Sequence, residues 1–229
     1  MRRLLTALLL LSMLGLGASC GGGGGGDAPP CTKPGTLRTL AVQGQPAPGT
    51  AGAYGAFNVG LPMDCAPGGW SAFVVGTTDA TRTQALFVAQ PDGSVLLAWH
   101  VGEAVPAGLP GGGTITSLQA LRINGSGQLV ALATLTGNTN SVAYALLAAT
   151  VSGGAVGAKG VVLLDRQDTT SSGSSGLVAA IDTSRLWLLA DGRVCVGGTT
   201  SDLTEAVWLV NLDGSALQSL VATGDSLPD

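Results

Sequence analysis

The sequence predicts an all-β fold of tandem four-stranded repeats that form a partial or open propeller, with a β-sandwich or a small barrel as the alternative. Short apolar runs are bounded by turn residues, two motifs recur at matching distances, and no helical period follows residue 20. The chain has 229 residues, of which 45% are hydrophobic and only 10% are charged. This composition argues against disorder and leaves enough residues for one β domain with a core.

The N-terminus has the features of an export signal. Arg2 and Arg3 precede an apolar stretch at 4–16, which is too short to span a bilayer core of ~30 Å. Small residues at 17–19 then lead to Cys20 and to a run of glycines at 21–26. We expect residues 1–19 to be a signal peptide and residues 20–35 to be a tether, because a glycine run is a flexible coil.

The segment Leu16-Gly17-Ala18-Ser19-Cys20 resembles the lipobox of bacterial lipoproteins, although its leucine lies four residues before the cysteine rather than three. The resemblance implies lipidation: Cys20 carries diacylglycerol, cleavage occurs just before it, and the new N-terminus is acylated, for example with palmitate. Several acyl chains together hold a protein stably on a membrane. Because Gly21 follows Cys20, the resemblance to Gram-negative lipoproteins favours the outer membrane, at its periplasmic face or at the cell surface. An ordinary secretory signal with an unrelated cysteine is the alternative.

Two motifs repeat along the exported part. A turn ending in proline, Gly-acid-x-x-Pro in its full form, occurs at 44–48, 102–106 and 224–228, with a degenerate copy at 166–168. A glycine before a short apolar strand occurs at Gly69, Gly127 and Gly192, and the first two intervals of both motifs are 58 and 65 residues. We therefore expect a β-repeat domain at 36–229, with repeats at about 44–101, 102–165 and 166–222.

Each repeat is expected to hold four strands, because its apolar runs are rich in Val, Leu, Ala and Thr and end at Gly, Asp or Asn. Asp92-Gly93 and Asp213-Gly214 lie between the last two strands of a repeat and predict hairpins there. Residues 37–42 precede the first proline turn as a fourth strand does later. The expected strands are 52–59, 70–76, 84–90 and 94–101, then 114–123, 128–135, 142–151 and 160–165, then 177–189, 193–199, 205–211 and 215–222.

Residues 36–229 also resemble a family of bacterial surface proteins of unknown function. That family carries tandem copies of a Gly-acid-x-x-Pro turn and a later Asn-x-x-Gly-x-x-Val-Ala strand. The strand motif is complete here only at 124–131, since the other repeats have lost the asparagine. The family brings no known activity with it.

The cysteines and the one histidine are the first candidates for chemistry. Beyond lipidated Cys20, export permits disulfides, and Cys31–Cys65 is the predicted pair, with free or buried thiols as the alternative. Cys65 and Cys195 align with apolar repeat positions, where cysteine is commonly buried. No two cysteines have metal-site spacing, and His100 lies beside Trp99 with no local acid or nucleophile. We expect no catalytic residue, no metal and no cofactor.

Acidic turns and tryptophans are the remaining candidates. Asp92, Asp191 and Asp213 each precede glycine, which predicts β-turns rather than Ca²⁺ loops, because Ca²⁺ needs several oxygens in one loop. Trp208 aligns with Phe87 and is expected in the core. Trp70 and Trp187 lie at less repetitive positions and could instead offer a sugar platform.

These observations predict a membrane-anchored, non-enzymatic envelope lipoprotein that displays its repeats for interaction or scaffolding. A propeller-type polysaccharide hydrolase or lyase is the alternative, and an envelope element without a ligand is a third hypothesis. The net charge is −4 and no basic cluster follows Arg3, which argues against nucleic acid as a partner. The expected partners are the membrane through the lipid anchor, an envelope protein or glycan, and a second copy of the chain. Three repeats are too few to close a propeller, which leaves an open arc, a six-bladed pair of chains or a fragment of a longer protein. Self-association is expected because an open arc exposes faces that normally pack on neighbouring blades.

Overall fold

The structure is a computed structural model that describes residues 38–106, 109–165 and 177–223. The chain divides into two units, residues 1–38 and residues 39–229, and all described secondary structure lies in the second. Thirteen strands form three antiparallel sheets, and the described residues contain one short 3₁₀ turn, at Pro67–Gly69, and no α-helix. The predicted all-β fold of tandem four-stranded repeats is therefore confirmed.

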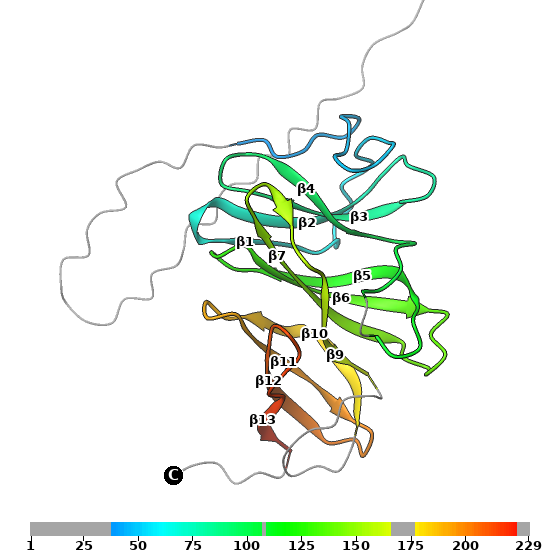
Figure 1. Ribbon diagram of the computed structural model, residues 1–229, viewed down its shortest axis with the longest axis vertical. Helices are drawn as coiled ribbons and strands as arrows, with labels where there is room; N and C mark the ends of the chain where they lie inside the picture. The colour runs from blue at the N-terminus through cyan, green and yellow to red at the C-terminus, as the bar shows by residue number, and fades with distance from the viewer. Residues whose placement is uncertain (1–37, 107–108, 166–176, 224–229) are drawn as a thin grey trace, which may run out of the picture. The chain divides into compact units, whose positions relative to one another are not determined.

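Each sheet is a meander in which strands pair with their neighbours along the chain, and we call it a blade (Figure 1). Blade 1 contains β1 (Met63–Ala66), β2 (Trp70–Gly76), β3 (Gln84–Ala89) and β4 (Val95–His100). Blade 2 contains β5 (Thr114–Ile123), β6 (Gln128–Thr136), β7 (Tyr144–Ser152), β8 (Ala155–Val156) and β9 (Gly160–Leu164). Blade 3 contains β10 (Val178–Leu188), β11 (Arg193–Thr200), β12 (Glu205–Asn211) and β13 (Gln218–Ala222).

Blade 2 departs from a simple meander at its fourth position. Both β8 and β9 pair with β7, so two short strands share the edge that one strand occupies in the other blades. The sequence predicts β9 but not the two-residue β8.

The predicted first strand at 52–59 is wrong. β1 lies at Met63–Ala66 and pairs with β2, with Met63 opposite Phe73. Tyr54 instead forms an isolated bridge to Thr77, and its backbone N–H and C=O bond to Gln45 and Gly44. Residues 55–62 thus interrupt the strand, because Gly60 has φ of +99° and proline at 62 has no N–H to donate.

A shared turn geometry joins strands within the blades. Three-residue loops close at 91–93, 125–127, 190–192 and 212–214, and in each the last residue is a glycine that bonds back to the residue before the loop. These glycines have φ between +73° and +100°, the left-handed region that glycine occupies without steric penalty. The predicted Asp-Gly hairpins are confirmed as this three-residue type.

Two hydrophobic cores lie between the blades. In blades 1 and 2, we call the side that packs on the following blade the rear face and the opposite side the front face. In blade 3, the rear face is the side that carries the equivalent strand positions. The rear faces of blades 1 and 2 carry eight side chains that are at most 4% exposed: Ala72, Val74, Leu86 and Val88, then Val130, Leu132, Leu146 and Ala148. The first set packs on the front face of blade 2, and the second set packs on that of blade 3 around Trp208. Face-to-face stacking of four-stranded meanders is propeller-like.

The front face of blade 1 is covered differently, because no blade precedes it among the described residues. Residues 44–54, which we call the front loop of blade 1, place Ala47 and Tyr54 on Phe73 and Phe87. The rings of Tyr54 and Phe87 meet edge-on, with centroids 5.0 Å apart. Among the described residues, no helix is long and apolar enough to span a membrane.

Candidate functional site

The structure describes Cys65 and Cys195 but not the other two cysteines. Cys20 and Cys31 lie outside the described residues, so lipidation and the Cys31–Cys65 disulfide stay predictions. Within the described part of the chain, neither Cys65 nor Cys195 forms a disulfide, and Cys65 is exposed while Cys195 is half-buried. Partial burial raises the pKa of the Cys195 thiol. The expected burial of Cys65 is wrong, because its side of blade 1 meets no other blade.

His100 takes part in a contact between blades. Its Nδ1 lies 2.8 Å from the Val101 carbonyl, and its backbone N–H donates to Glu103 at 3.2 Å. Glu103, the acid of the repeated turn, forms an ion pair with Lys159, and the Lys159 ammonium lies 5.9 Å from the Trp99 ring centroid. These groups tie the turn after β4 to the segment between β8 and β9. We assign them a structural role.

The acidic turns bind their own neighbours. Asp92 Oδ1 accepts hydrogen bonds from the backbone N–H and the hydroxyl of Ser94, and Asp213 Oδ1 accepts one from the Ser215 N–H at 2.9 Å. Asp191 accepts from the backbone and the guanidinium of Arg193, which lowers the pKa of Asp191 and raises that of Arg193. Each carboxylate therefore stabilises its own turn.

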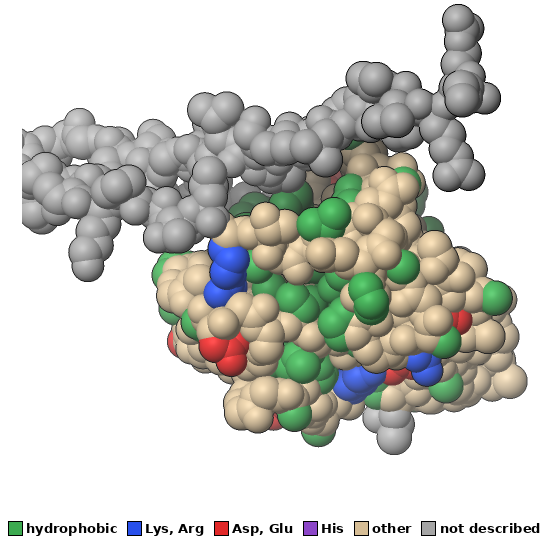
Figure 2. Space-filling model, turned by 90° about the horizontal axis from the view of Figure 1, so that it is seen from above, with side chains coloured by type: hydrophobic (Ala, Val, Ile, Leu, Met, Phe, Trp, Pro, Cys, Tyr) green, Lys and Arg blue, Asp and Glu red, His purple; other side chains and the backbone are tan. Residues whose placement is uncertain are grey.

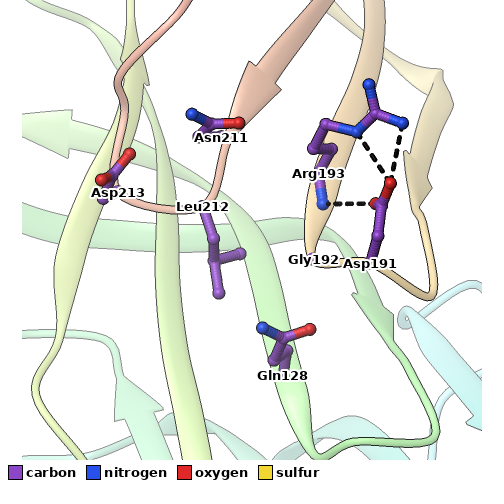
Figure 3. A pocket seen from close by; sticks show the side chains of 7 residues that line it. All are labelled: Gln128, Asp191, Gly192, Arg193, Asn211, Leu212 and Asp213. Carbon is purple, nitrogen blue, oxygen red and sulfur yellow. Dashed lines mark hydrogen bonds and ion pairs between the residues drawn. The ribbon is translucent and has the colours of Figure 1, made fainter.

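An open hollow of about 280 Å³ lies among the turns that face the boundary of blades 2 and 3. Gln128, Asp191, Arg193 and Asp213 are among its lining residues, and Figure 3 shows that the Arg193 guanidinium turns back onto Asp191. The acid and the base nearest each other are thus already paired. The hollow presents no converging catalytic set.

The tryptophans divide into buried and surface groups. Trp99 and Trp208 are fully buried, which confirms the predicted core position of Trp208. Trp70 is half-buried, and its ring lies so close to Gly127 that an added Cβ there would come within 2.7 Å of it. Trp187 is 47% exposed and is the tryptophan that presents an open ring surface.

Trp187 belongs to an uncovered apolar face, the rear face of blade 3. Two rows of paired residues cross it: Trp187, Cys195 and Leu209 in one row, and Gly197, Val207 and Val221 in the other. Trp187 and Val221 are exposed, and Cys195, Val207 and Leu209 are half-buried. Along one side, the Arg185 side chain crosses Gly197 and pairs with Asp182 and Glu205.

The front side of blade 1 carries a second group of exposed apolar residues. Met63 is 51% exposed and Phe57 is 46% exposed, and Val42 and Val59 are also exposed. Figure 2 views the end of the domain at which the front loop of blade 1 lies, and hydrophobic side chains gather there while charged ones lie mainly toward the margin. The domain thus presents apolar surface at both ends of its series of blades.

Sequence reasoning missed three groups that hold the repeats together. Asp79 accepts a hydrogen bond from the Ala51 N–H at 2.9 Å, and Asn138 donates to two carbonyls of residues 110–112. Each links the turn after the second strand to the loop in front of its own blade. The Ala51 N–H, then Thr81, hold the pKa of Asp79 down at about 2. The polar turn residues at 76–79 and 137–138, which follow the second strand in each case, were the available signal, whereas nothing local marks Lys159 as the partner of Glu103.

No known family, characterised protein or solved structure matches the chain. The lipobox and the surface-protein repeat family therefore remain resemblances of the sequence. The site with the clearest physical signature is the uncovered rear face of blade 3.

Proposed function

We propose that this protein is a membrane-anchored envelope lipoprotein that displays a propeller-like repeat domain for interaction or scaffolding. The uncovered apolar rear face of blade 3 carries the proposal. Large contiguous apolar surface on a soluble domain is typical of an interaction site. Trp187 at its edge is the residue type most enriched among the anchors of protein interfaces.

The location rests on the N-terminal sequence. A signal peptide at residues 1–19, with Cys20 and the glycine tether after it, supports export of the repeat domain and a lipid anchor at the outer membrane. The scaffold role is supported by the contacts of the described acids, which are engaged in their own turns or in contacts between blades. Asp191 and Asp213 line one open hollow, but Asp191 is already paired with Arg193 there.

Labelling with an alkyne fatty acid tests the anchor. The wild-type chain is expected to incorporate the label and to sediment with membranes, whereas Cys20→Ser is expected to incorporate none. Cys65→Ser is the matched control and is expected to label like the wild type. Equal labelling of wild type and Cys20→Ser would overturn the lipoprotein proposal.

A further inference from the structure

The two interfaces between blades share one packing contact, and each also has a hydrogen bond of its own. The residue that opens the second strand of one blade packs on a turn glycine of the next, as Trp70 does on Gly127 and Gln128 does on Gly192. The first strands are joined as well. Asp64 accepts a hydrogen bond from the Ile123 N–H at 2.9 Å, and Asn124 donates to the Leu189 carbonyl at 3.0 Å.

In blade 3, no described blade packs against the equivalent rear positions. Arg193 stands where Trp70 and Gln128 stand, and its guanidinium folds back onto Asp191. Trp187 stands at the position of Asp64, because each is directly opposite the equivalent residue of its second strand. The face has the pattern of a blade interface, with half-buried side chains at positions that are closed in blades 1 and 2.

In blade 1, no described blade packs against the equivalent front positions, although the front loop covers part of that face. Met63 aligns with Leu121 and Leu186, and these two leucines are fully buried while Met63 is 51% exposed. Cys65 aligns with Ile123, which is 5% exposed inside the core between blades 1 and 2. Gly69 aligns with Gly127 and has φ of +91°, but only Pro91 of its own blade lies near it.

The front loops match in the same way. In blade 1 the Gly44 N–H donates to the Tyr54 carbonyl and the Tyr54 N–H donates to Gln45. In blade 2 the Gly102 N–H donates to the Ile115 carbonyl, and the Ile115 N–H donates to Glu103. The blade 2 loop lies against the rear face of blade 1, since Val105 and Leu109 belong to that core. Blade 1 therefore already carries the element that a rear face receives.

We propose that the rear face of blade 3 binds the front side of blade 1 in a second copy of the chain, and that two chains close a ring of six blades. This inference rests on the proposed interaction role and names its partner. The six described blades of two copies fall within the four to eight that close a propeller, whereas the three described blades of one copy do not. Arg193 of one copy then packs on Gly69 of the other, and Trp187 packs beside Cys65.

Light scattering on the full chain carrying Cys20→Ser tests the pairing without the lipid. The expected mass is twice that of one chain at micromolar concentration. Val207→Arg and Leu209→Arg each place a charge on the rear face and are expected to give monomers. Gln119→Arg adds the same side chain to an exposed position of β5 in blade 2, whose two faces are already covered, and is expected to leave the pair intact.

Cross-linking tests the geometry and does not depend on how the arginine variants fold. One variant keeps only Cys65 and the other keeps only Cys195, with serine at the remaining cysteine positions. A short bismaleimide is expected to join the two variants when they are mixed and to join neither to itself. Efficient linking of Cys195 to Cys195 would instead indicate rear faces packed together and would overturn the proposal. A cooperatively melting monomer, with or without a glycan bound at Trp187, would overturn it as well, while leaving the fatty-acid labelling of Cys20 unaffected.

Discussion

The rear faces of blade 1 and blade 3 share their strand register and differ in what lies against them. In blade 1, Ala72 and Val88 are at most 1% exposed because the front face of blade 2 covers them. In blade 3, the equivalent Cys195 and Leu209 are half-buried. Alternation along a strand therefore determines which side chains share a face, and the neighbouring blade determines whether that face is dry.

The same comparison explains the contrast between two tryptophans of blade 3. Trp208 is on the front face and is fully buried in the core with blade 2, while Trp187 is on the rear face and is 47% exposed. Both lie within one sheet and both are large apolar rings. Their energetic contributions to a single chain should differ accordingly.

Replacing these two tryptophans is expected to give the largest difference. Trp208→Ala should lower the free energy of unfolding by about 3–5 kcal/mol, because it leaves a large cavity between blades 2 and 3. Trp187→Ala should cost about 0.5 kcal/mol or less in the monomer, as surface substitutions do. Urea unfolding followed by circular dichroism at low protein concentration measures both. Similar losses would mean that the rear face of blade 3 is covered within one chain.

Two glycines with the same backbone conformation sharpen the comparison between covered and open surface. Gly127 has φ of +73°, and an added Cβ would lie 2.6 Å from the Val151 carbonyl and 2.7 Å from the Trp70 ring. Gly137 has φ of +71°, and nothing lies within 4 Å of its added Cβ. Gly137→Ala should therefore show only the backbone cost of about 1 kcal/mol.

Gly127→Ala should lower the free energy of unfolding by about 2 kcal/mol or more, because the added methyl group must also push blade 1 away from blade 2. The same urea titrations give both values, and the difference between them reports the packing of the interface. Equal losses would contradict the close contact between Trp70 and Gly127.

The repeat spacing predicted the strands of blades 2 and 3 well, because those strands are continuous. The predicted ranges 114–123 and 205–211 coincide with β5 and β12. The first strand was misplaced because 52–59 has an apolar alternation that looks like a strand. Its backbone groups are instead taken up by the front loop at Gln45 and Gly44.

The candidate site was less predictable, for a physical reason. Cys65 occupies the same position in its repeat as Ile123, so the sequence predicted burial for both, yet only Ile123 has a blade in front of it. Long-range pairs such as Glu103 with Lys159 join segments whose approach depends on how blades stack. A repeat pattern predicts the strands of one blade and their register, but it does not predict which face of a blade has no other blade packed against it.

Asp79 and Asp213 provide the smallest and most selective test of covered against open positions. Asp79 is 7% exposed and binds the front loop through Ala51, whereas Asp213 is exposed and binds only its own turn. The pKa of Asp79 falls from 3.8 to about 2 in the folded state, so its charged form stabilises the fold above pH 4, and that contribution disappears as the pH falls toward 2.

Asp79→Asn should therefore lower the urea midpoint at pH 7, and its urea midpoint should decrease less than that of the wild type between pH 4 and pH 2. Asp213→Asn is the matched control and should be nearly silent at pH 7, because an asparagine oxygen can accept the same N–H from Ser215. If both variants behaved alike, the bond from Ala51 would contribute nothing beyond an ordinary turn, and the front loop would have to be held by its other contacts, such as the Ala53–Thr78 hydrogen bonds and the packing of Tyr54.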